Sequence, residues 1–405
     1  MKPLGPIPAG YAAGPDGVLR IGGAPVTALV AQGGTPLFVY DRDRLRARVA
    51  DLRAAMPARL AVHYAVKANP FAPLLAEMAR LVDGFDVASG GELGAALAAG
   101  MAAGRVSFAG PGKVDLELAA AIRAGATLHL ESAREAERAL AIAERQGITP
   151  RLAIRVNPDF GLAGSGMKMG GGAKPFGIDA AQVPDLARRI VAAGAAWRGF
   201  HIYAGSQALS APAVIAAQAQ TVALAVQLAD AAGVDLPHLN LGGGFGIPYF
   251  PGDVALDVGA VGAALADTLG ALPAATQVCI ELGRWLVGEA GVYLTRIVYR
   301  KESHGAVFLV ADGGLHHQLA ASGNFGTVVR RNYPLAIATR FAAEPVEEAS
   351  VVGCLCTPLD RLADNALFPR AEEGDIVAVF CAGAYGASAS PAAFLGHGPA
   401  REILI

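Results

Sequence analysis

Lys67 closes an apolar run of the kind that forms a buried strand. The run is His63-Tyr64-Ala65-Val66, and Asn69-Pro70 then begins a turn. An amine at the end of such a strand is desolvated, which lowers its pKa and makes it a nucleophile. A lysine that forms a Schiff base with an aldehyde needs this setting. A lone lysine at a strand end more often reaches solvent, so its accompanying residues decide the interpretation.

Three other chemically capable side chains lie in or at the ends of further apolar runs: Asp86, His201 and Glu281. An unpaired carboxylate at the end of an apolar strand is costly, so Glu281 needs a cationic partner. A protonated pyridine nitrogen would serve, and so would an internal arginine. His201 could stack on an aromatic ring, or it could be a core histidine whose ring nitrogens are hydrogen-bonded within the protein.

Two glycine-containing segments suggest an anion site. Gly242-Gly243-Gly244 follows one apolar run, and Gly283-Arg284 follows the next. Consecutive glycines let backbone N–H groups converge on an anion, and a guanidinium adds a charged fork, although tight turns use glycine too. A nucleophilic amine, a phosphate site and a carboxylate for a ring nitrogen together match one cofactor, pyridoxal 5'-phosphate (PLP).

The elements that must position these residues follow a regular alternation. Eight apolar runs alternate with helical stretches, and eight parallel strands are the number that closes a (β/α)8 TIM barrel. A doubly wound open sheet is the competing fold. In a TIM barrel the chemistry lies at the carboxyl ends of the strands, which is where these residues fall. The predicted strands lie near 60–66, 85–88, 106–110, 127–131, 151–156, 197–203, 238–242 and 277–281.

The pattern changes near residue 290, which predicts a second, mostly-β domain. We expect the PLP-binding barrel to cover 36–290, and 1–35 with 291–405 to form the β domain. The expected strands after 290 are Val292–Arg300, Ala306–Ala311, Glu347–Val352 and Asp375–Phe380. Segment 157–177 is rich in glycine and long, as expected of a lid or substrate loop.

Composition excludes several classes of protein. The 405 residues are 53% hydrophobic and carry a net charge of −2, which favours neither nucleic acid nor an anionic membrane as partner. The four cysteines lack zinc-ligand spacing, so no metal site is predicted. No signal peptide is evident, and glutamines interrupt the apolar stretch near 211–229, which predicts a packed helix and no membrane span. A cytoplasmic location is expected.

Several motifs, in order, resemble the fold-type III PLP-dependent decarboxylases, which include the ornithine, arginine and diaminopimelate decarboxylases. This resemblance implies the alanine racemase/ornithine decarboxylase fold and a homodimer with two shared active sites, in which the β domain completes the active site and the dimer interface. The motifs are Tyr64–Asn69, Phe85–Leu93, Lys174–Gly177, His201–Ser206, Gly242–Gly246, Glu281–Arg284, Cys356–Asp360 and Gly383–Gly386.

The resemblance also implies a role for each matched residue. Lys67 would form the Schiff base, Glu281 would pair with the pyridine nitrogen and His201 would stack on the ring. Cys356 would reach the site from the other subunit and protonate the carbanion. The remaining cofactor contacts would come from Asp86, Ser206, Gly243, Gly244, Gly283, Arg284 and Tyr385.

Departures from the family pattern concern the substrate. The ornithine and diaminopimelate enzymes carry an acid after the catalytic cysteine, whereas this chain has Thr357. Arg330 and Arg331 suggest a carboxylate, a carbonyl or a phosphate-bearing arm in place of a distal ammonium. Arg331, Tyr333, Thr357 and Asp360 are the expected substrate residues. A pair of arginines on the surface is the alternative.

The residues of the His201–Ser206 motif resemble those of a subgroup of decarboxylases that act on amino acids bound to a carrier protein. Its members occur in antibiotic pathways and in bacterial envelope or exopolysaccharide gene clusters, including decarboxylases associated with exosortase systems. The predicted substrate is a small-molecule or carrier-bound amino acid, such as a diaminopimelate-like compound or a glutamyl group on an acyl carrier protein. A PLP-dependent racemase and a catalytically silent regulatory relative are the alternative functions.

Overall fold

A computed structural model describes residues 1–164, 166–168, 170–323 and 330–405. The chain divides into two compact units. The barrel unit consists of Arg48–Ile247 and Ala255–Trp285, and the β unit consists of Met1–Ala47, Pro248–Val254 and Leu286–Ile405.

The barrel unit holds eight parallel strands in a closed ring. Each strand pairs with its neighbour along the chain, and the last, β15, pairs in parallel with the first, β5. The predicted TIM-type barrel is therefore confirmed, and the open sheet is excluded because the ring has no free edge. The strands are β5 (Leu60–Ala65), β6 (Gly84–Val87), β7 (Val106–Phe108), β8 (Thr127–Leu130), β9 (Arg151–Asn157), β12 (Ala196–Ile202), β14 (His238–Asn240) and β15 (Gln277–Leu282).

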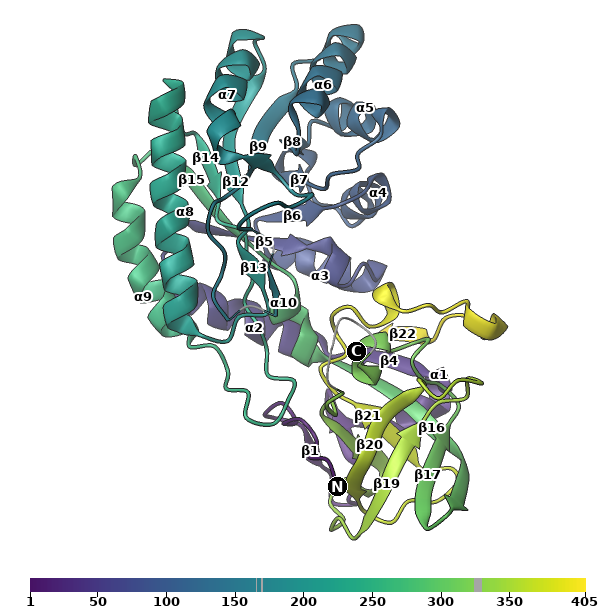
Figure 1. Ribbon diagram of the computed structural model, residues 1–405. Coiled ribbons are helices and arrows are strands. Elements are labelled where there is room, and N and C mark those ends of the chain that lie inside the picture. The colour runs from purple at the N-terminus through teal and green to yellow at the C-terminus, as the bar shows by residue number, and fades with distance from the viewer. Residues whose placement is uncertain (165, 169, 324–329) are drawn as a thin grey trace. The chain divides into compact units, whose positions relative to one another are not determined.

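Helices cover the outside of these strands (Figure 1). Their ends follow local chemistry: the Ser89 and Ser132 hydroxyls each accept a backbone N–H three residues on, and Gly125 and Gly147 close helices in the left-handed conformation. The helices include α2 (Arg42–Ala55), α3 (Ala72–Leu81), α4 (Gly90–Ala98), α5 (Asp115–Ala124), α6 (Ala133–Gln146), α7 (Val183–Ala192), α8 (Ala211–Ala232) and α9 (Val258–Thr268).

Helix α8 is apolar and long enough to cross a membrane by length and composition alone. Its buried residues recur every three or four positions, from Val214 through Ala217 and Thr221 to Leu228. This spacing puts them on one face, and α8 packs against α7 and α9. The predicted packed helix is therefore what the structure shows.

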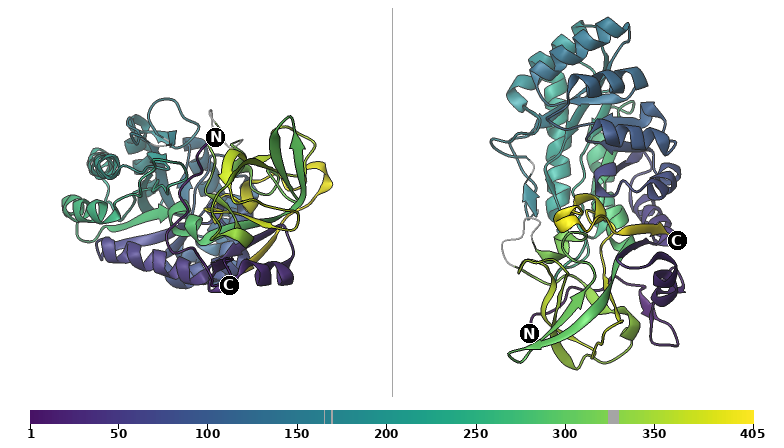
Figure 2. Two further views of the ribbon diagram at one scale, coloured as in Figure 1. Left: turned by 90° about the horizontal axis from the view of Figure 1, so that it is seen from below. Right: turned by 90° about the vertical axis from the view of Figure 1, so that its right-hand side faces the viewer.

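The β unit is built around an eight-stranded sheet, whose long β16–β17 hairpin can be followed in Figure 2. The four strands expected after residue 290 are present as β16 (Gly291–Ser303), β17 (Ala306–Ala311), β19 (Glu347–Val352) and β21 (Ile376–Val379). Strand β4 (Leu37–Tyr40) pairs with β16 and with β22 (Arg401–Leu404), so both chain ends contribute. The sheet also contains β18 (Leu335–Ile337) and β20 (Arg361–Phe368).

Strand β20 was not expected from the sequence because polar residues interrupt it. Asn365 has a positive φ of 46°. The register of β20 against β19 shifts between Ala349 and Val351 of β19. The Ser350 hydroxyl accepts a hydrogen bond from the Asn365 backbone N–H. A bulge of this kind breaks the alternation that marks a strand in a sequence.

Candidate functional site

A cavity of about 200 Å³ opens at the carboxyl ends of the barrel strands. Lys67, Asp86, Arg155, His201 and Glu281 all line it. A cavity of about 150 Å³ holds a benzene ring in an engineered protein, so one aromatic ring fits here. The structure thus brings together four residues that the sequence separates by more than 200 positions, and Arg155 of β9 lies with them.

Lys67 lies one residue into a 3₁₀ turn, Val66–Ala68, that follows β5. Its side chain is exposed, and its Nζ lies 5.7 Å from the centre of the Tyr203 ring. The expectation of a desolvated amine is therefore wrong for this structure, because the turn carries Lys67 beyond the strand to the cavity. Asn69 fixes the turn: its backbone N–H donates to the Val66 carbonyl at 3.1 Å.

Glu281 is a buried carboxylate with two polar neighbours on one oxygen. Asn240 Nδ2 donates to its Oε2 at 3.2 Å, and His201 Nε2 lies 3.3 Å from the same atom. Burial by itself would raise the pKa of Glu281, but the positive charges of His201, Lys67 and Arg155 lower it to about 2. Glu281 is therefore ionised at neutral pH and can hold a positive charge beside it.

A second histidine, His129, fixes the ring of His201. The two Nδ1 atoms lie 2.9 Å apart. Burial, aided by the charge of His201, lowers the pKa of His129 well below its usual value. His129 is therefore neutral, and its contact with His201 Nδ1 holds the His201 ring with Nε2 facing Glu281.

Asp86 interacts with two polar side chains of neighbouring barrel strands. The Ser107 hydroxyl donates to its Oδ1, and His63 Nδ1 lies 3.4 Å from its Oδ2. Burial would lower the pKa of His63, but the neighbouring Asp86 charge outweighs burial and raises it. Asp86 and His63 thus form an ion pair in the barrel core.

Glu131 ties three loops together at the cavity. Its Oε1 accepts from Arg155 Nη1 at 2.8 Å and from the Gly110 N–H at 2.6 Å, and its Oε2 accepts from the Gly177 N–H at 2.7 Å. Burial would raise the pKa of Glu131, but Arg155 and the Gly177 N–H lower it. Arg155 in turn lies 5.2 Å from the centre of the Phe176 ring.

The predicted phosphate residues lie on two adjoining loops. The Ala208 N–H donates to the Gly244 carbonyl at 2.8 Å, and the Gly246 N–H donates to the Ala208 carbonyl at 2.9 Å. Ser206 lies two residues before Ala208, in the short strand β13 (Gly205–Ser206). In the described part of the chain, the Gly243 and Gly244 backbone N–H groups have no acceptor, so they are open to an anion.

Glycine is required at positions 243, 244 and 283 for close packing. A Cβ on Gly243 would lie 1.8 Å from the Glu281 carbonyl oxygen, and a Cβ on Gly244, whose φ is +96°, would lie 2.2 Å from that of Gly205. A Cβ on Gly283 would lie 2.7 Å from Ala68 Cβ. Gly283 therefore lets the turn that carries Lys67 approach Arg284, which begins the short helix α10 (Arg284–Val287).

The remaining predicted residues belong to the β unit. Cys356 is exposed on the loop Gly353–Asp360. Asp360 shapes this loop, because its Oδ1 accepts from the Leu315 N–H at 2.6 Å and its Oδ2 accepts from the Leu355 N–H at 2.9 Å. The Thr357 hydroxyl accepts from the Leu359 N–H at 3.3 Å.

Arg331 and Tyr333 belong to an aromatic cluster of the β unit. The Arg331 guanidinium lies 3.7 Å from the centre of the Phe250 ring, and the Tyr333 ring lies 4.7 Å from that of Tyr249. Tyr385 has a positive φ of 55°, a conformation that costs a non-glycine residue energy and marks functional segments.

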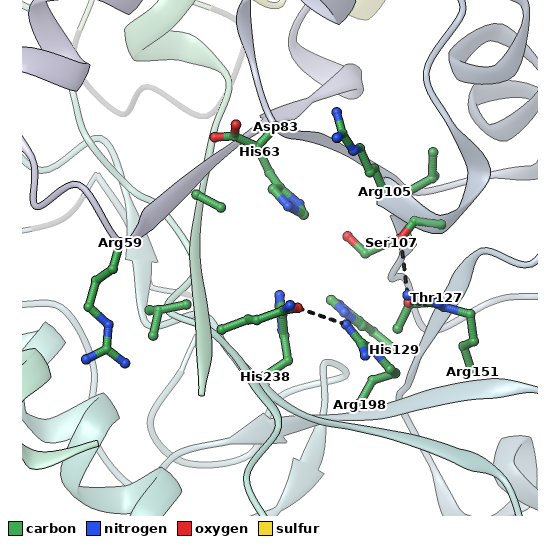
Figure 3. Close-up of a pocket in the computed structure, with 15 residues that line it drawn as sticks. Arg59, His63, Asp83, Arg105, Ser107, Thr127, His129, Arg151, Arg198 and His238 are labelled. Atoms are coloured by element: carbon green, nitrogen blue, oxygen red, sulfur yellow. Dashed lines mark hydrogen bonds between the residues drawn. The ribbon is translucent and has the colours of Figure 1, made fainter. Parts of the chain in front are cut away.

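A second cavity, of about 340 Å³, lies at the amino ends of the barrel strands. Figure 3 shows Arg59, Arg105, Arg151 and Arg198 around it, with His238 and His129 on its wall. The guanidinium of Arg59 donates to backbone carbonyls, and that of Arg198 to Gln277. Barrel enzymes carry their chemistry at the opposite end, so we assign these arginines to closing the strand ends.

Sequence reasoning missed His129, Glu131 and Asn240 as site residues. Each is a polar residue within or just after an apolar strand, as are Asp86 and His201. Buried polar side chains require partners, so a polar residue in any barrel strand was a usable signal.

The donor set fits PLP. Lys67 supplies an amine at the cavity, the ionised Glu281 suits a protonated ring nitrogen, and the open N–H groups of Gly243 and Gly244 suit a phosphate.

Comparison with known proteins agrees with this fit. Residues 42–288 match the family model "Pyridoxal-dependent decarboxylase, pyridoxal binding domain". The chain is 36% identical over 393 residues to the L-glutamyl-[BtrI acyl-carrier protein] decarboxylase of Niallia circulans, covering 94% of this chain and 91% of that one. It is 31% identical over 386 residues to the diaminopimelate decarboxylase of Methanothermobacter thermautotrophicus, covering 92% and 87%.

Solved structures show the same fold. The diaminopimelate decarboxylase of Helicobacter pylori complexed with L-lysine superposes with a TM-score of 0.84 at 26% identity, over 94% of each chain. That of M. jannaschii superposes with a TM-score of 0.87 at 25% identity, over 97% of this chain and 92% of the other.

This chain belongs to the pyridoxal-dependent decarboxylase family of fold-type III. It is a PLP-dependent amino acid decarboxylase, as the motifs predicted.

Proposed function

We propose that this chain decarboxylates an α-amino acid whose far end is neutral or joined to a carrier protein, such as a glutamyl group held as a thioester on an acyl carrier protein. The observation that carries this proposal is the loop Gly353–Asp360. Its one carboxylate is Asp360, and both oxygens of that group already accept backbone N–H groups. A distal ammonium would find no free acid on this loop, and an unpaired buried charge is costly.

The charges near this loop favour the same kind of substrate. Arg330 Nη2 donates to the Leu359 carbonyl at 3.2 Å, so a guanidinium adjoins the loop that carries Cys356. Burial lowers the pKa of Arg330, which indicates that nearby negative charge does not fully offset the cost of burying this cation. A carbonyl or carboxylate is a better neighbour for Arg330 than an ammonium. The relative at 36% identity is a decarboxylase of a glutamyl carrier protein.

The residues would divide the work as follows. Bound PLP supplies an electron-poor ring that accepts the charge left when carbon dioxide departs. Lys67 would bind the cofactor covalently, Glu281 would hold the proton on the ring nitrogen, and His201, oriented by His129, would pack on the ring face. The phosphate would bind to Ser206, Gly243, Gly244 and Arg284, with Gly283 beside them, and the family resemblance assigns Tyr385 to the same cofactor.

Cys356 would protonate the substrate carbon in a homodimer in which each site takes this residue from the other subunit. Its exposed thiol supports that role. Mixing inactive Lys67→Ala protein with inactive Cys356→Ala protein under subunit exchange should restore about a quarter of the activity, since half the dimers are mixed and each has one intact site. No restored activity would place both residues in one subunit's site.

Carbon dioxide release decides the substrate. We expect release from a glutamyl-loaded carrier protein and none above background from free glutamate, ornithine or diaminopimelate. The Thr357→Glu variant should gain activity on diaminopimelate, whereas the matched Thr357→Val variant should not. Equal turnover of free diaminopimelate and the loaded carrier by the unmodified protein would refute the proposal.

A further inference from the structure

Three potential metal ligands lie together in the β unit, and none of them is among the residues assigned above. They are His316, Cys354 and His397, and one ligand atom from each lies within 4.8 Å of the others. Cys354 Sγ lies 3.9 Å from His397 Nε2, and the His316 and His397 ring centres are 5.0 Å apart. Two imidazoles and a thiolate are ligands that zinc prefers, and three protein ligands leave a fourth position open.

His316 provides the second, independent observation. Its side chain is fully buried, and neither ring nitrogen has a hydrogen-bond partner within the described residues. Its neighbour His317 contrasts with it, because Tyr293 Oη lies 3.1 Å from its Nδ1 and the Gly398 carbonyl lies 3.0 Å from its Nε2. Buried imidazoles are normally hydrogen-bonded or coordinated, so the unsatisfied His316 calls for a partner that a metal would supply.

The alternative partners for His316 do not fit the surroundings. The nearby carboxylate of Asp360 has both oxygens occupied by backbone N–H groups. The Asp312 side chain accepts from Thr35 and Thr295, so it is also engaged. Cys354 is a free thiol whose Sγ lies 3.6 Å from the Asp312 carbonyl oxygen. The cluster is therefore a soft nitrogen and sulfur set without a competing acid, which disfavours calcium and magnesium.

We propose that His316, Cys354 and His397 form a binding site for a thiophilic divalent cation, of which Zn²⁺ is the best fit, with water in the fourth position. Binding releases the Cys354 thiol proton to solvent, and the sulfur becomes a thiolate ligand. The site would join three segments of the β unit: the start of the stretch after β17, the loop that carries Cys356, and the C-terminal segment before β22. Cys354 is two residues from Cys356, so the metal would steady the loop of the predicted proton donor.

Metal content of the full-length, PLP-loaded protein tests the proposal. After treatment with a chelator, exposure to Zn²⁺ and desalting, we expect about one zinc per chain by elemental analysis. The Cys354→Ser and His397→Ala variants should retain less than about a tenth of that amount. His397 is exposed, so its replacement keeps the test valid if the Cys354 variant does not fold. The matched controls, Cys356→Ser and His304→Ala, should retain the metal.

Cobalt gives a readout that does not depend on activity. Adding Co²⁺ to the chelator-treated protein should produce the visible bands of a tetrahedral site with a thiolate charge-transfer band, read as a difference from the chelated sample. The bands should be absent in Cys354→Ser and present in Cys356→Ser. The proposal would be overturned if the unmodified protein contained no zinc after desalting. It would also be overturned if the Cys354→Ser variant contained as much zinc as the unmodified protein. These outcomes are independent of the substrate, so they separate this proposal from the proposed function.

Discussion

Replacing Glu131 by glutamine should destabilise the barrel unit strongly, although the two side chains have the same shape. Glu131 accepts from the Arg155 guanidinium at 2.8 Å and from the backbone N–H groups of Gly110 and Gly177 at 2.6 and 2.7 Å. The amide of glutamine keeps one oxygen acceptor and turns an NH₂ toward the other donors. Arg155, whose side chain is buried, then loses its counter-charge.

The magnitude follows from the burial of this pair. The side chains of Arg155 and Glu131 are 9% and 2% exposed, so solvent does not replace the lost charge. Breaking a buried ion pair by removing one partner costs about 3–5 kcal/mol. The lost backbone hydrogen bonds are part of the same disruption, so we take about 3–5 kcal/mol as the expected loss in free energy of unfolding.

Tryptophan fluorescence is the right assay, because both tryptophans, Trp197 and Trp285, belong to the barrel unit. Urea unfolding followed by this signal reports on the barrel alone. The matched control is Glu137→Gln, since Glu137 is exposed and pairs with Arg134 and Arg189 on the helix surface. Surface pairs contribute little, so the control should unfold close to the unmodified protein. Equal midpoints for the two variants would refute the assignment of Glu131 as the residue that joins the loops.

Three further predictions concern the cofactor and pH. Glu281→Gln should lower kcat about a hundredfold or more, because an amide cannot stabilise a cation beside it; unchanged kcat would contradict this role. Gly244→Ala should weaken PLP retention on dialysis, since its Cβ would lie 2.2 Å from the Gly205 carbonyl oxygen, whereas Gly270→Ala, which meets nothing within 4 Å, should not. Burial and nearby positive charge lower the pKa of His238 from 6.5 to about 3, so its stabilising effect is present above pH 6.5 and is lost as pH falls toward 3. Between pH 7 and pH 5 the free energy of unfolding should fall by about 2 kcal/mol, because pH 5 lies 1.5 units below 6.5 and each unit is worth about 1.36 kcal/mol. The His238→Asn variant should lose correspondingly less free energy of unfolding, measured by urea unfolding at the two pH values. The same pH dependence in the variant and the unmodified protein would contradict this prediction.

The sequence was enough to predict the barrel because its signals are local. Each of the eight strands is a short apolar run between helical stretches, and the closed ring follows from their number. The strand ends then identified Lys67, Asp86, His201 and Glu281, which the structure places around one cavity. Strand β20 was missed because Asp364 and Asn365 interrupt the apolar pattern where the strand bulges.

Pairings between distant residues could not be predicted in the same way. Nothing local to Glu131 shows that its carboxylate meets the Gly177 N–H, 46 positions away. The engagement of Asp360 by backbone N–H groups is equally invisible in the sequence, and there Asp360 was expected to bind substrate. In the structure this aspartate shapes the loop that carries Cys356.

The interior of the barrel explains why so many of the missed residues are polar. His63 and His129 line the cavity at the amino ends of the strands, and their partners Asp86 and His201 line the cavity at the carboxyl ends. The two cavities are thus separated by two hydrogen-bonded or ion-paired couples, at 3.4 Å and 2.9 Å. An apolar residue in place of His129 would remove the polar partner that holds the His201 ring, and His201 is one of the residues that lower the pKa of Glu281. The chemistry at one end of this barrel therefore depends on side chains whose surfaces face the other end.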